Sequence, residues 1–265
     1  MLVYVLFTSA FLAYLLAGSL YTKQFFSHSS KVVKVAQLAL MLALASHLGL
    51  LIVEAHSTDG QRLSLSYVAS MLACLVTLTI FITNRFIKNL IFLPVVSFVS
   101  AAAVLISVIL PNTTGITVQM NAAMITHILL SLIAYGVLSI SMLYACQLAY
   151  INYQLKHKKR IMLTGTLPPL MSVEKILYQL MSYGAIMLII ALVTGFLFVP
   201  NMFADGYAHK TLLSSLSVVV YVACIVLHHF VGLRARVTVI LNLIGLSLLT
   251  LGYFGSRLVQ ELLLR

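Results

Sequence analysis

The chain has 265 residues, of which 62% are hydrophobic and only 8% are charged, and its mean hydropathy is +1.10. A soluble domain has about 45–50% apolar and about 25% charged residues, so this composition excludes a soluble globular protein and indicates an integral membrane protein. The net charge of +11 does not require a nucleic-acid partner, because the placement of the cations in loops explains it.

Eight apolar segments are long enough to cross a bilayer, since about 20 apolar residues span its hydrocarbon core. In chain order they cover residues 3–22, 35–53, 66–83, 90–110, 121–148, 176–199, 209–231 and 237–257. No linker separates soluble domains. The sequence therefore predicts an all-α integral membrane protein, a bundle of about eight transmembrane helices that forms a single polytopic domain over residues 1–265.

Most of the lysines and arginines lie in alternate loops, beginning with the first loop. They are Lys23, Lys31, Lys34, Arg85, Lys88, Lys156, Lys158, Lys159, Arg160, Lys175, Arg234 and Arg236. Only Arg62, Lys210, Arg257 and Arg265 lie in the other loops or at the C-terminus. By the positive-inside rule, the first set faces the cytoplasm, which puts both termini outside, on the periplasmic side of a bacterial inner membrane.

The fifth segment is longer than a bilayer requires. Its helical pattern runs from Asn121 to about Leu155, which is about 52 Å at 1.5 Å per residue, so the helix is expected to project into the cytoplasm. It must end before the double proline of "GTLPPL", and Ser172 is then expected to cap the next helix.

Carboxylates and cysteines offer little chemistry inside the membrane. The acidic residues, Glu54, Asp59, Glu174, Asp205 and Glu261, all fall at or beyond the predicted helix ends, which argues against an ion-driven transport cycle. The cysteines, Cys74, Cys146 and Cys224, form no C-x-x-C-H motif, so covalent c-type haem is excluded and a packing role is expected. No nucleophile–base pair, metal cluster or nucleotide motif predicts an enzyme.

Three histidines lie within the apolar segments, where an ionisable residue suggests a function. His47 and His127 each lie about 9 Å below the outer surface, so they could face one another across a haem or share a water network. His228 lies near the opposite face, and either it or His229 can point into the bundle. Each of the three is therefore either a haem ligand or a hydrogen-bond partner of a neighbouring helix.

The histidine-containing segments are similar to those of one protein family. "THILLSLIAYGVLSISMLYACQLAYINYQLK", with Tyr135 eight residues after His127, resembles a span of the CcsA/ResC-type cytochrome c assembly proteins. "LPPLMSVEKILYQL" resembles the elbow and next helix of that family, and "HHFVGLRAR" resembles a further motif that aligns His228, Gly232 and Arg234. The resemblance covers about residues 40–258 and is strongest to an inner-membrane branch of the family.

This resemblance implies a membrane protein that binds or handles haem b. The implied ligands are His127 and His228, with His47 as a substitute partner for His127, and Arg234 would meet the haem propionates. The family's tryptophan-rich outer loop is replaced by "VPNMFADGYAHK" in a chain without tryptophan, and a second outer histidine is replaced by "LLTLGYFGSR". We therefore expect haem handling without synthetase activity, and no metal other than haem iron.

Two further functions remain open. The chain could be a haem-free accessory or regulatory subunit of another inner-membrane protein, such as a divalent-metal exporter; His47 and His127 would then hydrogen-bond to Ser, Thr or Tyr on neighbouring helices. It could also be a b-type electron carrier, although the inner half offers only His228 or His229 as ligands. The haem-handling function predicts instead that His127 and His228 face the bundle interior, each near a cavity large enough for a porphyrin, whereas the accessory function predicts no such cavity.

Overall fold

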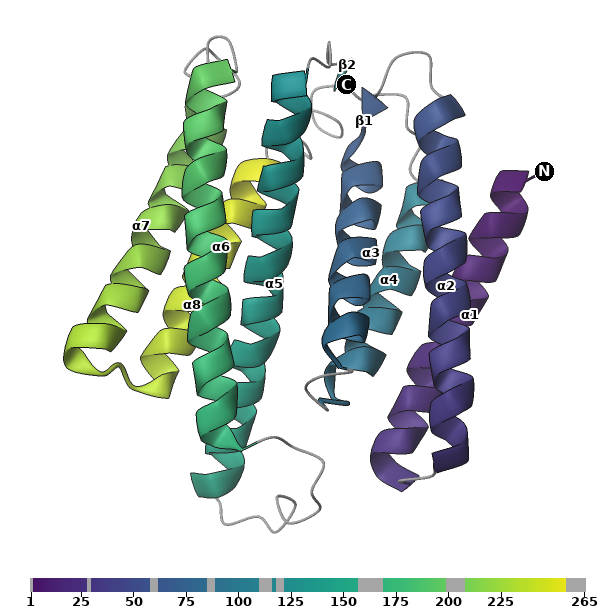
Figure 1. The fold of residues 1–265 in the computed structure, drawn as a ribbon, viewed down its shortest axis with the longest axis horizontal. Coiled ribbons are helices and arrows are strands. Elements are labelled where there is room, and N and C mark those ends of the chain that lie inside the picture. The colour runs from purple at the N-terminus through teal and green to yellow at the C-terminus, as the bar shows by residue number, and fades with distance from the viewer. Residues whose placement is uncertain are drawn as a thin grey trace. The chain divides into compact units, whose positions relative to one another are not determined.

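A computed structural model of the protein describes residues 2–27, 30–57, 62–84, 89–109, 116–117, 122–156, 169–198 and 208–255. The chain divides into two compact units, unit 1 over residues 1–119 and unit 2 over residues 120–265. Within the described ranges, eight helices are long and apolar enough to cross a membrane, which confirms the prediction of eight spans (Figure 1). The single domain over residues 1–265 stays a prediction.

Unit 1 is built from four helices and a short pair of strands. The helices are α1 (Leu2–Ser27), α2 (Ser30–Ser57), α3 (Leu65–Thr83) and α4 (Phe92–Ile109). Helix α1 packs along α2 and α4, and α3 packs against α4. The buried residues of α1 and α2 include Ala10, Ala13, Ala17, Ala36, Ala39 and Ala43. Small side chains let two helix backbones approach closely, which is how membrane helices gain packing energy without a hydrophobic driving force.

The strands of unit 1 were not predicted from the sequence. Strand β1 (Arg62–Leu63) pairs antiparallel with β2 (Ile116–Thr117), with Arg62 opposite Thr117. Two residues are too few to produce an alternating apolar pattern, so this pairing leaves no signal in the sequence. The all-helical prediction is confirmed for the membrane-spanning elements, and the two short strands lie in the connections between helices, β1 after α2 and β2 after α4.

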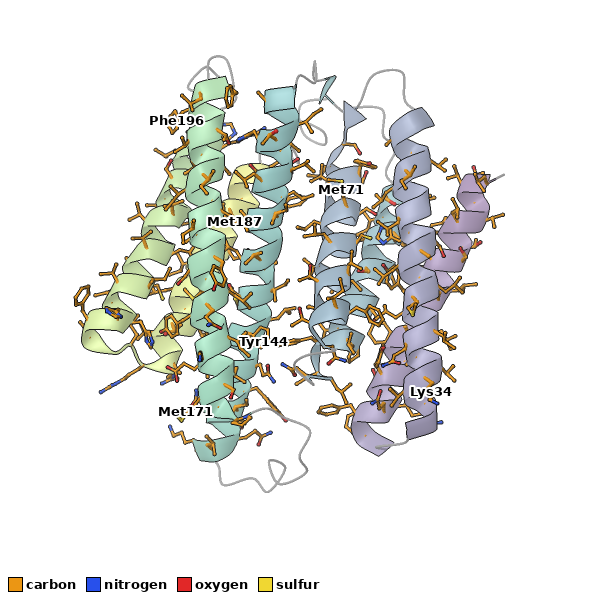
Figure 2. All side chains as sticks on the ribbon, in the orientation of Figure 1. Lys34, Met71, Tyr144, Met171, Met187 and Phe196 are labelled. Carbon is orange, nitrogen blue, oxygen red and sulfur yellow. The ribbon has the colours of Figure 1, made fainter. Side chains whose placement is uncertain are left out.

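Unit 2 contains the other four helices. They are α5 (Ala122–Lys156), α6 (Leu170–Phe198), α7 (Ala208–Val231) and α8 (Ala235–Thr250), and α8 continues into a π-helix, η3 (Leu251–Gly255). Helix α5 packs along α6 and against α8, and α7 packs against α6 and α8. The α5–α6 hairpin extends beyond the turn that joins α7 to α8 (Figure 1). Figure 2 shows Met171 and Phe196 at opposite ends of α6.

The boundaries of two helices test the predictions around the elbow. Helix α5 runs without interruption to Lys156, which confirms the long fifth helix. Helix α6 begins at Leu170, before the predicted start of the span at residue 176, and the prediction that Ser172 caps it is wrong. The carbonyl of Pro169 accepts the backbone N–H groups of Ser172 and Val173 at 3.0 and 3.1 Å, so Ser172 already lies in the first turn.

The last predicted span contains two types of helix. An α-helix was expected over residues 237–257, but α8 ends at Thr250 and the chain widens into the π-helix η3. Apolar periodicity does not separate these two helix types over so few residues. The hydroxyl of Tyr135 on α5 hydrogen-bonds Thr250 at 2.7 Å, and its ring contacts Phe254 with centroids 5.9 Å apart, so α5 meets α8 at this transition.

Candidate functional site

His47 of α2 is completely buried in unit 1, and both of its ring nitrogens have partners. Its Nδ1 lies 3.0 Å from the hydroxyl of Tyr14 on α1, and its Nε2 lies 2.8 Å from the hydroxyl of Ser70 on α3. The imidazole therefore joins three helices. An iron ligand needs a free ring nitrogen, so His47 could bind iron only after one of these buried hydrogen bonds was broken.

His127 of α5 is half-buried in unit 2 and uses a single ring nitrogen. Its Nδ1 lies 2.9 Å from the backbone carbonyl oxygen of Ala191 and 3.2 Å from the hydroxyl of Thr194, both on α6. The Thr194 hydroxyl itself donates to the Ala191 carbonyl at 2.9 Å. Among the described residues, no hydrogen bond involves Nε2 of His127.

The contact with Ala191 decides the tautomer of His127. A carbonyl oxygen can only accept, so the proton of the neutral imidazole must be on Nδ1, where it donates to Ala191. The lone pair is then on Nε2. A histidine whose Nδ1–H is held by a backbone carbonyl while Nε2 is free has the arrangement found in metal-ligating histidines. The donor set at His127 therefore fits coordination to iron.

His228 of α7 has a different environment. Its ring is stacked on that of Tyr178 from α6, with centroids 3.4 Å apart and planes 15° apart. Its Nδ1 is buried and has no hydrogen-bond partner within the described part of the chain. The Tyr178 hydroxyl hydrogen-bonds Thr238 of α8 at 2.6 Å, so the stack joins α6, α7 and α8. His228 therefore faces other helices of unit 2, whereas the neighbouring His229 is exposed.

A tight turn follows His228 and leads to the predicted Arg234. Gly232 has a φ of +72° and its N–H bonds to the His228 carbonyl at 3.1 Å, which is the left-handed glycine that commonly ends a helix. Arg234 then precedes α8 as its N-cap residue, without a side-chain capping bond, and is exposed. His228 and Arg234 thus lie at the same turn.

His127 and His228 lie at opposite ends of unit 2. The partners of His127 on α6 are Ala191 and Thr194, whereas His228 stacks on Tyr178, 13 residues earlier on the same helix. At 1.5 Å per residue, the two positions are about 20 Å apart along α6. One iron atom cannot bind both. His47 belongs to unit 1 and has its own partners there.

Several other buried polar groups of unit 2 bond to one another. Asn242 of α8 donates to the Ser141 hydroxyl at 3.0 Å and its carbonyls lie 3.4–3.5 Å from the Tyr221 hydroxyl. Ser217 donates to the Gly245 carbonyl at 2.8 Å. Among the described residues, no group of three or more His, Cys, Asp or Glu side chains could hold a metal ion. Cys74 and Cys224 are buried as expected for packing residues, but Cys146 is exposed on α5.

Several functional partners could not be found from the sequence. Tyr14, Ser70 and Thr194 carry no motif, and only their positions on neighbouring helices bring them to the histidines. Tyr178 lies within the segment "LPPLMSVEKILYQL", which resembles the assembly family. That resemblance indicated the importance of the segment but did not predict that Tyr178 stacks on His228.

Comparisons with known proteins agree with this architecture. Residues 2–264 match the family described as Cytochrome C assembly protein. The chain is 35% identical over 205 residues to the inner membrane protein YpjD of Escherichia coli strain K12, which covers 77% of this chain and 78% of that protein. An uncharacterized 28.8 kDa protein of Azospirillum brasilense is 33% identical over 140 residues, 52% of each chain. No solved structure matches the chain.

The similarity to YpjD and the eight apolar helices confirm the prediction of a multi-pass inner-membrane protein.

Proposed function

Since the chain belongs to the cytochrome c assembly protein family, we propose that it handles haem b in the inner membrane and binds it through His127. If haem were bound, the neutral imidazole of His127 would hold it as a ligand of the iron that haem supplies. The residues of unit 2 hold and orient that imidazole.

The observation that carries this proposal is the hydrogen bond from Nδ1 of His127 to the Ala191 carbonyl. It fixes the ring orientation and leaves the Nε2 lone pair available, and the Thr194 hydroxyl adds a second contact on the same side of the ring. The surrounding helices are apolar, which favours an apolar macrocycle with its charged groups near the membrane surface.

The other proposed ligands support haem binding less well. His47 has no free ring nitrogen, so we do not propose it as the partner of His127. His228 is a candidate for a second, separate site at the α7–α8 turn, with the exposed Arg234 placed to meet a propionate. The two sites would be about 20 Å apart, so each would hold its own haem or receive it in turn.

We also propose how the chain is oriented in the membrane and which haem chemistry it does not perform. Most cations lie in alternate loops, which favours both termini outside and puts the His127 end of unit 2 on the periplasmic side. The chain contains no tryptophan and therefore lacks the family's tryptophan-rich loop, so we propose that it holds haem but does not attach it covalently to a protein.

A second candidate function is that of a haem-free accessory subunit of another inner-membrane protein. The geometry of His47 favours it, because Tyr14 and Ser70 use both ring nitrogens as that function requires. The contact of His127 with Thr194 is of the same kind. The two functions differ in one respect that can be measured, namely whether Nε2 of His127 binds iron.

The test is an absorbance spectrum of the full chain, purified in mild detergent from haem-sufficient cells, with the haem quantified as its pyridine haemochrome. We expect the haem content per chain to fall in His127→Ala and to stay unchanged in His209→Ala, a matched control because His209 is an exposed histidine at the start of α7. If no Soret band forms even after haemin is added, or if His127→Ala keeps the full haem content, the proposal is wrong and the accessory function becomes the better one.

A further inference from the structure

Helices α5 and α6 extend beyond the other two helices of unit 2 at the end where α6 begins. The Tyr178 hydroxyl of α6 bonds to Thr238, which lies only one helical turn from the start of α8. Helix α6, in contrast, continues from Tyr178 back to Leu170, a distance of about 12 Å at 1.5 Å per residue. The α5–α6 hairpin and the α7–α8 turn therefore form a step (Figure 1).

The length of α5 indicates that this step lies at the membrane surface and in water. Helix α5 has 35 residues and is about 52 Å long, whereas a bilayer with its headgroups is about 40–45 Å thick. Arg234 and Arg236 are exposed at the α7–α8 turn, and arginine side chains near a helix end reach to the headgroups. The turn therefore marks the membrane surface, and the end of the hairpin projects beyond it.

One face of the hairpin loses its cover at this step. Tyr178 packs against α7 and α8, and Lys175 and Met171 precede it by three and seven residues, so all three lie on the same face of α6. Tyr153 lies 18 residues, or five full turns, after Tyr135, which packs against α8. The α7–α8 pair covers these faces within the membrane and leaves Lys175, Met171 and Tyr153 exposed beyond it.

The exposed side chains at the step are large and apolar, or basic. Met171 is 80% exposed, and Phe230 at the end of α7 is 79% exposed. Within residues 144–156, 169–178 and 228–238, Glu174 is the one carboxylate, and it is half-buried. The step surface is defined here by Tyr153, Lys156, Met171, Lys175, Phe230 and Arg236.

We propose that the step surface is the docking site of an acidic amphipathic segment of a partner protein. Large apolar side chains exposed to water mark a site of protein interaction, and an apolar helix face of the partner covers Met171, Tyr153 and Phe230. Carboxylates of the same segment pair with Lys175 and Arg236, so the charges of the two surfaces are complementary. This docking does not depend on haem binding at His127.

Charge and position argue against two other occupants. A symmetric dimer through the step surface would bring like cations together, since each copy presents the same surface to the other. The chain has only five acidic residues, and Glu174 is the only one near the step. Anionic phospholipids could pair with the cations, but their acyl chains stay on the membrane side of the headgroups and do not reach Met171 or Tyr153.

The test records photo-cross-links of the full chain in the membrane of intact cells. The photo-reactive amino acid p-benzoylphenylalanine takes the place of Met171, the cells are irradiated, and the cross-linked peptides are identified by mass spectrometry. We expect a discrete adduct with one segment of another protein, in which Asp and Glu outnumber Lys and Arg. The same amino acid at Val219, which is exposed in the middle of α7, should give no adduct with that segment.

Removal of two cations tests the charge complementarity. Lys175→Gln together with Arg236→Gln should lower the yield of the adduct by about 2- to 30-fold, because two exposed ion pairs are lost. Lys23→Gln together with Lys34→Gln is the matched control, since both are exposed lysines of unit 1 and the yield should not change. All these side chains are exposed, and size-exclusion profiles check that each variant folds.

Four results would overturn the proposal. They are the absence of a protein adduct at Met171, an adduct with lipid or with a second copy of this chain alone, a partner segment without an excess of Asp and Glu, and an adduct whose yield is unchanged when Lys175 and Arg236 are both replaced. Capture of a protein is therefore not sufficient, because both the acidity of its segment and the dependence on the two cations are required.

Discussion

Replacement of Thr194 by valine tests how the imidazole of His127 is held. Valine has nearly the same shape as threonine but lacks the hydroxyl that lies 3.2 Å from Nδ1 of His127. The Ala191 carbonyl, 2.9 Å from the same nitrogen, is part of the backbone and remains. Thr194→Val should therefore loosen the ring without changing its tautomer, and weaken haem binding without abolishing it.

The size of this effect follows from the geometry. Hydrogen bonds between membrane helices contribute about 0.6 kcal/mol on average and about 1.7 kcal/mol at most. Since about 1.4 kcal/mol corresponds to a tenfold change in affinity, the Kd for haem should rise between about threefold and about sixteenfold. The lower end is expected, because the shorter contact to Ala191 is retained. Removal of the only partner of a ligating histidine can weaken metal binding up to about a hundredfold. A hundredfold rise in the Kd of Thr194→Val would therefore be larger than the loss of this one contact explains.

The assay is a haemin titration of the purified protein in detergent, followed by the Soret band. Ser182→Ala is the control on the same helix, since within the described part of the chain the Ser182 hydroxyl bonds only to the Tyr178 carbonyl, at 2.8 Å, and its removal should leave the Kd unchanged. An unchanged Kd in Thr194→Val would refute the idea that this hydroxyl helps to orient the ring. Equal weakening in both variants would mean that the loss reflects general destabilisation of α6.

Three further outcomes are expected. Gly245→Ala should lower the free energy of unfolding in detergent by about 1–3 kcal/mol, because the new Cβ would lie 2.7 Å from the buried ring of Tyr221, whereas Gly255→Ala, whose Cβ makes only ordinary contacts, should not. Tyr178→Phe should keep the stack on His228 but lose the hydrogen bond to Thr238, which should lower the free energy of unfolding by about 0.6 to 1.7 kcal/mol. A melting curve identical to that of the wild type would contradict this. A phosphatase that works only in the periplasm should be active when fused to the C-terminus and inactive in the α5–α6 loop, and the reverse pattern would invert the proposed orientation.

The course of the chain through the membrane could be read from the sequence because it depends on length and apolarity. In the bilayer, the backbone N–H and C=O groups of a single segment can all be hydrogen-bonded only if the segment is a helix. A run of about 20 apolar residues therefore predicts a helix whatever surrounds it. The long helix α5 followed for the same reason, since its apolar pattern continued to about Leu155. The start of α6 did not follow, because Pro169 supplies its carbonyl to the first turn and no capping side chain marks the place.

The partners of the histidines could not be predicted, because they depend on which helices pack together. His47 and His127 looked equivalent in the sequence, each about two turns from the outer end of its helix. In the fold, the neighbours of His47 present two hydroxyls, from Tyr14 and Ser70, while the neighbours of His127 present contacts to one nitrogen only. The residues that make this difference lie 23 to 67 positions away in the chain.

This difference separates the roles expected of the two histidines. Iron ligation needs one ring nitrogen free and the other fixed, and His127 meets that condition through the Ala191 carbonyl. His47 instead uses both ring nitrogens, for Tyr14 and Ser70, and so links three helices of unit 1. A histidine with two buried partners gives up a hydrogen bond to bind metal, so His47 is a poor ligand. We therefore expect the same residue type to have a different role in each unit, according to whether one ring nitrogen is left free.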